Sequence, residues 1–147
     1  MAAHTSGSEA ADVLERMLHE GFAVGNADIV DELCSPEIVE HQFGLSGDGG
    51  EAIDKIKRAI VAVHTAMPDL RFDVADVAVA GDTVWMRAEA TGTNTGPFIG
   101  APTGKPVRFT VFDVATVREG RIVEHWGVPD RFALLVQTGQ LEKLAAP

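Results

Sequence analysis

The stretch V-R-F-T-V-F-D-V-A-T-V-R-E-G-R-I-V-E-H-W-G-V-P-D, residues 107–130, decides the fold of this chain. It reads as two long strands joined by a tight turn at Glu119-Gly120. Asp113, His125 and Trp126 lie among its apolar positions. An ionisable group buried without a partner costs more free energy than one hydrogen bond returns. These groups therefore either pair for structure or line a pocket.

The turn leaves two pairings of these strands open. A two-residue turn sets Arg118 opposite Arg121, which places Asp113 opposite Trp126 on the same face. A bulged three-residue turn would instead place Asp113 opposite His125. Because neighbouring residues on a strand point to opposite faces, we expect either His125 or Trp126 in the pocket, and not both.

The segments upstream of this hairpin predict an α+β fold. Apolar residues recur at helical spacing over residues 13–22 and 53–67, and a short helix between them ends at Leu33. The period changes to two over residues 70–91, which predicts two more strands. Helices grouped before an antiparallel meander indicate the α+β class, here arranged as a cone. In it, three N-terminal helices pack on a curved, mostly antiparallel sheet and enclose an apolar cavity.

Two segments flank the hairpin. Residues 91–106 form a loop rich in Gly, Pro and Thr, whose apolar residues Phe98 and Ile99 would suit a lip over a pocket. A plain connection explains this loop equally well. After the hairpin we expect a helix from Arg131 to about Gln137. Asp130 precedes it, as a helix cap or as a residue of the site.

Size and charge exclude several classes of partner. The chain has 147 residues and a formal net charge of −10. We expect one domain over residues 1–147, with residues 1–8 as a flexible N-terminal tail. The negative charge argues against a nucleic-acid partner and against anionic membranes. No secretory signal or spanning apolar run is visible, so we expect a cytoplasmic protein without a membrane partner.

Several catalytic chemistries find no support in the residues. The single cysteine, Cys34, excludes an intrachain disulfide. Residues 40–41 and 124–125 are both Glu-His and offer one histidine each, so we expect no metal site. No G-x-S-x-G occurs, which argues against a serine hydrolase. The glycines of residues 96–104 lack the strand-then-helix context of a phosphate loop.

The order of elements and four motifs resemble the SnoaL-like polyketide cyclases, within the nuclear-transport-factor-two-like superfamily. The motifs are F-A-V-G-N-A-D-I-V-D-E-L (22–33), S-P-E-I-V-E-H (35–41), G-P-F-I-G-A-P-T-G-K-P-V (96–107) and R-I-V-E-H-W-G-V-P-D (121–130). The resemblance covers nearly the whole chain and is more specific for the fold than for the reaction.

This resemblance implies small-molecule chemistry in the cavity of an α+β barrel, commonly a homodimer, without metal or organic cofactor. Family cyclases close a ring of an aromatic polyketide by an intramolecular aldol step, and related proteins include cofactor-independent hydroxylases. We therefore expect a hydrophobic carbonyl compound as ligand, in polyketide biosynthesis. A non-catalytic ligand-binding or dimerisation module of the same fold is the alternative, since a fold alone does not give a function.

One departure from the family pattern concerns the reacting groups. The aldol cyclases place their catalytic aspartate two residues after the histidine of the last-strand motif, and that position is Gly127 here. Their histidine on the preceding strand corresponds to Asp113. The acid is therefore expected across the hairpin, which favours a relative with different chemistry, such as the hydroxylase type.

The candidate catalytic residues are Asp113, His125 and His41. Burial in an apolar strand disfavours the ionised form of Asp113, which makes it a stronger general base. Asp113 could instead be a structural ion-pair partner of Arg87 or Arg108. Either histidine could donate a hydrogen bond to a developing enolate, and either could equally be a surface residue.

The candidate substrate-binding residues are mostly aromatic. Their rings would hold a flat ligand, although the two tryptophans could instead belong to the core. The candidates are Trp126, Phe109, Phe98, Trp85, Gln42 and Asp130.

Overall fold

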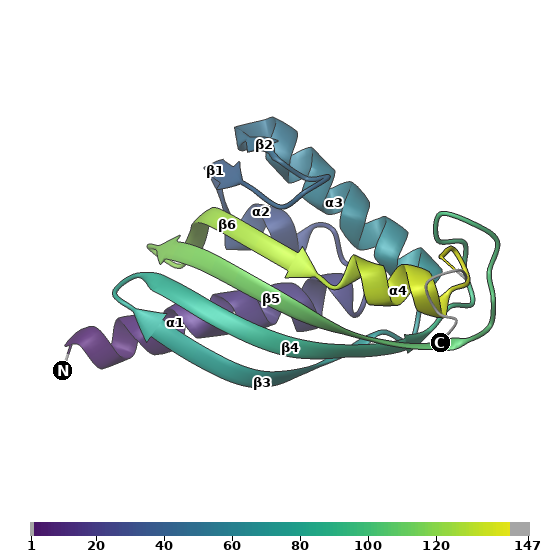
Figure 1. Cartoon of the computed structure of the whole chain (residues 1–147). Helices are drawn as coiled ribbons and strands as arrows, with labels where there is room; N and C mark the ends of the chain where they lie inside the picture. The colour runs from purple at the N-terminus through teal and green to yellow at the C-terminus, as the bar shows by residue number, and fades with distance from the viewer. Residues whose placement is uncertain (1, 142–147) are drawn as a thin grey trace.

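The predicted hairpin lies near the middle of a six-stranded sheet in the computed structural model, which describes residues 2–141 (Figure 1). Its strands are β5 (Pro106–Arg118) and β6 (Arg121–Pro129). The strand order is β2-β1-β6-β5-β4-β3, where β3 (Arg71–Ala80) and β4 (Thr83–Thr93) are the other two predicted strands. All neighbours are antiparallel except β1 and β6, which confirms the mostly antiparallel sheet.

Two further strands, β1 (Cys34–Glu40) and β2 (Gly47–Asp48), are absent from the sequence prediction. Proline within a short run argues against a strand, and Ser35-Pro36 indicates the end of a helix. β1 nevertheless pairs in parallel with β6 and sets Glu40 opposite His125. This pairing joins residues far apart in the sequence, so local patterns do not reveal it.

The turn of the hairpin has two residues, as in one predicted pairing, but the register beyond it differs. One extra residue on β6, Val123, bulges out of the ladder. Past this bulge the register moves by one residue, so Asp113 lies opposite Gly127. The pairings predicted with Trp126 and with His125 are therefore both wrong, because neither included a bulge inside β6.

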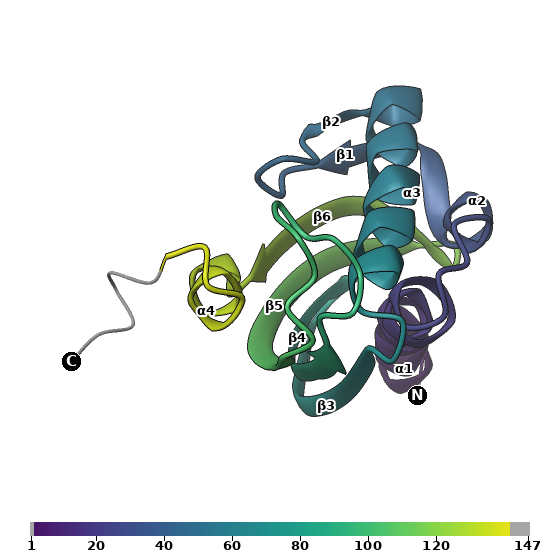
Figure 2. The same ribbon diagram turned by 90° about the vertical axis from the view of Figure 1, so that its right-hand side faces the viewer.

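Three N-terminal helical segments cover the concave face of the sheet, as predicted (Figure 2). They are α1 (Ala2–Arg16), continued by the π-helical turn η1 (Met17–Phe22), then α2 (Ile29–Leu33) and α3 (Gly49–Ala66). The α+β cone is thereby confirmed. The backbone of residues 2–8 lies in α1, and Met1 lies outside the described residues. The flexibility of the predicted tail stays a prediction.

Helix α4 (Arg131–Gln137) follows β6 over the predicted residues. Asp130 caps it, because its Oδ1 accepts a hydrogen bond from the Ala133 N–H at 3.0 Å. None of the described helices is both long enough and apolar enough to cross a membrane.

The inward face of β5 shows how the sheet meets the helices. Val107, Phe109, Val111, Asp113 and Ala115 alternate with outward residues and are all buried. A fully buried large apolar side chain contributes about 1.5–3 kcal/mol to folding. A buried carboxylate instead needs a partner, so Asp113 marks the position on this face where function and packing compete.

Candidate active site

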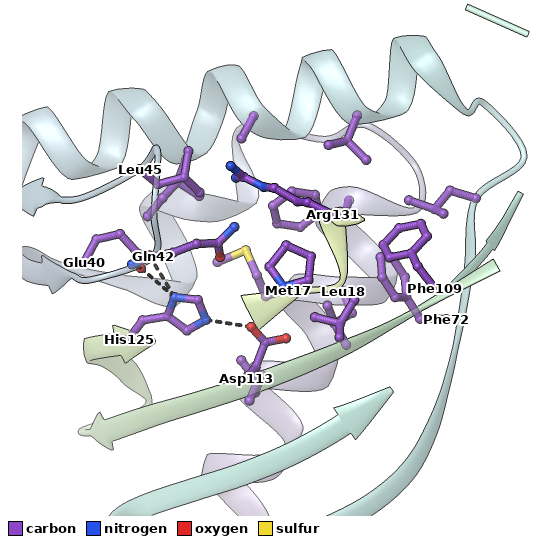
Figure 3. Close-up of a pocket in the computed structure, with 18 of the residues that line it drawn as sticks. Met17, Leu18, Glu40, Gln42, Leu45, Phe72, Phe109, Asp113, His125 and Arg131 are labelled. Atoms are coloured by element: carbon purple, nitrogen blue, oxygen red, sulfur yellow. Dashed lines mark hydrogen bonds and ion pairs between the residues drawn. The ribbon is translucent and has the colours of Figure 1, made fainter. Parts of the chain in front are cut away.

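A cavity of about 280 Å³ lies between the helices and the inner face of the sheet (Figure 3). Its lining is mostly apolar and comes largely from η1, α3 and the strands β1, β5 and β6. Few lining side chains are acidic, basic or carry an amide, and they are Glu40, Gln42, Asp113, His125 and Arg131. An apolar cavity with a few convergent polar groups is the usual form of a small-molecule site.

Three of these side chains form one hydrogen-bonded chain across three neighbouring strands. Nδ1 of His125 on β6 lies 2.8–2.9 Å from the carboxylate oxygens of Glu40 on β1. Its Nε2 lies 2.9 Å from Oδ1 of Asp113 on β5 (Figure 3). The strand order β1-β6-β5 thus sets the histidine between two acids.

This Glu40–His125–Asp113 chain is almost wholly removed from solvent. The side chains are 1%, 13% and 8% exposed, respectively. Burial alone would lower the pKa of His125, but the hydrogen bonds and negative charges of Asp113 and Glu40 raise it to about 10. The ring is therefore an imidazolium at neutral pH and donates through both nitrogens.

The two acids are held differently. Oε1 of Glu40 also accepts the backbone N–H of Gln42 at 2.8 Å, so Glu40 is tied on two sides. Asp113 uses only Oδ1, and its Oδ2 has no hydrogen-bond partner among residues 2–141. Figure 3 shows the Asp113 side chain pointing into the cavity. A carboxylate with one oxygen oriented and the other open can accept a proton from a molecule bound there.

Gly127 provides the space in which these side chains meet. A Cβ at this position would overlap Oε1 of Gln42 and would lie 2.8 Å from Cε1 of His125 and 3.0 Å from Oδ1 of Asp113. Asp113 is directly opposite Gly127 on the neighbouring strand. An acid at position 113 therefore occupies the region that a side chain at position 127 would enter.

Part of the predicted site surrounds the cavity. Besides Asp113 and His125, the lining includes Phe109 on β5, Phe98 and Gln42. Phe98 belongs to the loop of residues 94–105, so this loop contributes to the cavity wall as well as connecting two strands. The side-chain amide of Gln42 has no hydrogen-bond partner within the described part of the chain, although it lies beside the catalytic candidates.

The other predicted site residues do not line the cavity. Trp126 and His41 stack on the outer face of the sheet with ring centroids 4.5 Å apart, and His41 Nε2 lies 2.8 Å from Glu124 Oε1. Trp85 is 56% exposed, because its neighbours on β4 are the ones that point inward. The expectation that Trp126, His41 and Trp85 enter the pocket is therefore wrong, because the strand register directs their side chains to the outer face. Asp130 does not line the cavity either, and it caps α4.

An arginine partner was the structural alternative for Asp113. Arg87 instead lies 2.7 Å from Asp76, and Arg108 lies 3.3 Å from Glu89. Within the described residues the ion-pair partner of Asp113 is His125. The geometry therefore links Asp113 to the cavity and to the histidine.

Of the three hydrogen-bonded residues Glu40, His125 and Asp113, Glu40 is the one that is not among the predicted site residues. A signal was present, because the tetrapeptide I-V-E-H occurs twice, at residues 38–41 and 122–125. The two copies lie side by side on parallel strands. Glu40 and His125 meet on the inner face, while His41 and Glu124 meet on the outer face, so the repeat produces two Glu–His pairs back to back.

Solved structures resemble this chain along most of its length. IdmH from Streptomyces antibioticus, provisionally described as a polyketide cyclase, is 31% identical, with 88% of this chain and 98% of that chain covered and a TM-score of 0.72. AclR from Streptomyces galilaeus, provisionally described as a hydroxylase, is 26% identical, with 92% and 83% covered and a TM-score of 0.79.

A SnoaL-like protein from Jannaschia sp. CCS1 shares the fold, at 24% identity, with 90% and 92% of the two chains covered and a TM-score of 0.77. No curated protein matches the chain. The family model described as SnoaL-like polyketide cyclase matches residues 12–138, which is most of the sequence. The chain therefore belongs to the SnoaL-like polyketide cyclase family.

Proposed function

We propose that this protein is a cofactor-independent enzyme that removes a proton next to a carbonyl group of a polyketide or a similar hydrophobic compound. The observation that carries the proposal is Asp113, whose Oδ2 is open to an apolar cavity while Oδ1 is held by an imidazolium. The membership of the family and the relatives described as cyclase or hydroxylase support this class of reaction.

In this mechanism Asp113 Oδ2 accepts the proton from carbon, and the electrons of the C–H bond pass to the carbonyl oxygen to form an enolate. His125 and the free amide of Gln42 are the donors near this oxygen, and preorganised donors of this kind carry much of an enzymatic rate. When Asp113 becomes neutral, the Nε2–H of His125 is released from a charged acceptor and can turn to the enolate.

The enolate then has two outcomes. In an aldol cyclisation its carbon attacks a second carbonyl of the same molecule, and the new alkoxide takes the proton back from Asp113. In a hydroxylation the enolate carbon bonds to dioxygen, and the resulting peroxide takes the proton back from Asp113 to give a hydroperoxide. Loss of water from this hydroperoxide leaves a new carbonyl group, whose enol form is the new hydroxyl group, so one oxygen atom enters the product and the other leaves as water. The departure at positions 113 and 127 favours the hydroxylase type.

Replacement of Asp113 by asparagine tests the proposal. The variant keeps the size of the side chain but lacks the basic oxygen, so it should bind flat aromatic carbonyl compounds and lose turnover by at least about a hundredfold, the usual contribution of a general base. Asp73→Asn, on the exposed side of β3, is the matched control. Ligand binding with no turnover in either protein would instead indicate a non-catalytic ligand-binding module.

We further propose that the enzyme acts in the cytoplasm as a homodimer that pairs through the outer face of its sheet. This face carries an apolar row across three strands, in which Trp85, Val114 and Trp126 are cross-strand neighbours, and Phe112 and Val128 lie beside it. Sedimentation equilibrium should give twice the chain mass. Trp85→Glu should give a monomer, whereas Val24→Glu, at an exposed position away from the sheet, should not.

A further inference from the structure

Arg131 is the sole lysine or arginine among the described residues that line the cavity. Its guanidinium lies beside the backbone of Gly44, where a Cβ would be 3.4 Å from Nη1, and its Cζ lies 5.8 Å from the ring centroid of Phe43. Figure 3 shows the side chain reaching over the cavity toward Leu45 and Gln42. Arg131 is an exposed residue, so its positive charge lies at the open edge of the cavity, away from Asp113.

No carboxylate of the described residues lies within ion-pair distance of this guanidinium. Other arginines of the chain are neutralised in that way: Arg16 by Glu20 and Glu32, and Arg118 by Asp82. Some other basic side chains, such as Arg58, also lack an acid partner among the described residues, but Arg131 is the one that lines the cavity. Its fork of N–H donors matches a carboxylate in geometry as well as in charge.

We infer that Arg131 binds a carboxylate group of the substrate, which is therefore an acid with an apolar body. This inference rests on the proposed function and narrows its substrate class. At the other wall, the hydrogen-bonded residues Glu40, His125 and Asp113 comprise two acids and one imidazolium. Their net negative charge repels an anion, whereas Arg131 attracts it. The two ends of the cavity thereby fix the direction of the ligand, with its carboxylate at Arg131 and its reacting carbonyl at Asp113.

A matched pair of ligands tests the inference, namely an anthraquinone carboxylic acid and its methyl ester, measured by calorimetry. The wild type should bind the acid about tenfold more tightly than the ester, the effect expected for one charge-assisted contact. Arg131→Gln should remove this preference, so that the variant binds the acid and the ester with about equal affinity. Arg131→Lys should recover part of it, because the charge is kept and the fork is lost. Arg58→Gln, on the exposed side of α3, should behave as wild type.

The acid-to-ester ratio is taken within one variant, so a partial loss of folded protein cancels. Equal affinity of the wild type for both ligands, or an unchanged ratio in Arg131→Gln, would overturn the role of Arg131 while leaving the proposed reaction in place. Failure of both ligands to bind any of the proteins would overturn the proposed function, and the inference with it.

Discussion

At the scale of single residues, the chemistry of the site depends on the proton that His125 shares with its two acids. Its pKa of about 10 in the folded protein lies above the value of about 6.5 for an unfolded histidine. The folded state therefore binds this proton more tightly. The resulting stabilisation is complete below about pH 6.5 and is lost as the pH rises toward 10.

The free energy of unfolding should consequently fall between pH 7 and pH 9, with this one group contributing a slope of up to about 1.4 kcal/mol per pH unit. Glu40→Gln removes one of the two groups that raise the pKa, so its slope should be shallower. Urea unfolding at several pH values measures both slopes. Glu37→Gln, at an exposed position of the same strand, should keep the wild-type slope. Equal slopes in the wild type and in Glu40→Gln would contradict the assignment.

Gly127→Ala is expected to impair the site more than the fold. The backbone of Gly127 does not have the left-handed conformation that favours glycine, so the cost comes from space alone. The added methyl group displaces Gln42 and presses on the bond between His125 and Asp113. We expect a loss of kcat of at least about tenfold with a destabilisation of about 1–3 kcal/mol. Gly50→Ala is the control, because a Cβ there meets nothing within 4 Å. Unchanged turnover in Gly127→Ala would show that these contacts adjust without consequence.

At the scale of secondary-structure elements, the limits of the sequence become visible. The hairpin, the position of its turn at Glu119-Gly120, α4 and the apolar face of α3 follow from local periodicity and were predictable, whereas the choice between a two-residue and a three-residue turn was not. The bulge at Val123 was not, because a single extra residue leaves the alternation of the flanking residues almost intact. That residue decides that His125 points inward and Trp126 outward. The partner Glu40 depends on the parallel pairing of β1 with β6, which no local pattern encodes.

The loop of residues 94–105 owes its shape to one buried side chain. Nδ2 of Asn94 donates to the Gly96 carbonyl at 2.8 Å, and its Oδ1 accepts the Thr103 hydroxyl at 2.8 Å. The loop carries Phe98 and Ile99 into the cavity wall. The hydrogen bonds of Asn94 therefore stabilise the fold and also hold the loop residues that form part of the cavity wall.

Asn94→Ala should leave these groups without partners and destabilise the protein by about 1–3 kcal/mol. Hydrogen exchange should rise across residues 94–105, and ligand affinity should fall because Phe98 is no longer held. Asn26→Ala, which removes one local hydrogen bond at an exposed site, should do neither. Exchange that stays slow in the loop of Asn94→Ala would mean that the backbone bonds suffice to order it.

At the scale of the whole molecule, the cone is a fold that keeps part of its interior empty. The three helices and the curved sheet bury apolar faces against each other, yet a volume of about 280 Å³ remains between them. Protein interiors are normally packed as densely as organic crystals, so such a space forgoes stability. Retention of that space is expected of a fold whose purpose is to surround a ligand.

Ala59→Leu exposes this conflict between stability and function. Ala59 lies on α3 and lines the cavity, so the larger side chain should fill empty apolar space and stabilise the protein by about 1–2 kcal/mol. The same atoms occupy the ligand site, so affinity for aromatic ligands should fall at least about tenfold. Ala62→Leu makes the same replacement at an exposed position of the same helix. It should change neither the stability nor the ligand affinity, because alanine and leucine are both good helix formers. Thermal unfolding and calorimetry measure the two effects. A loss of stability in Ala59→Leu would mean that the cavity is too rigid to accept the larger side chain. An unchanged affinity of this variant for aromatic ligands would mean that ligands bind elsewhere.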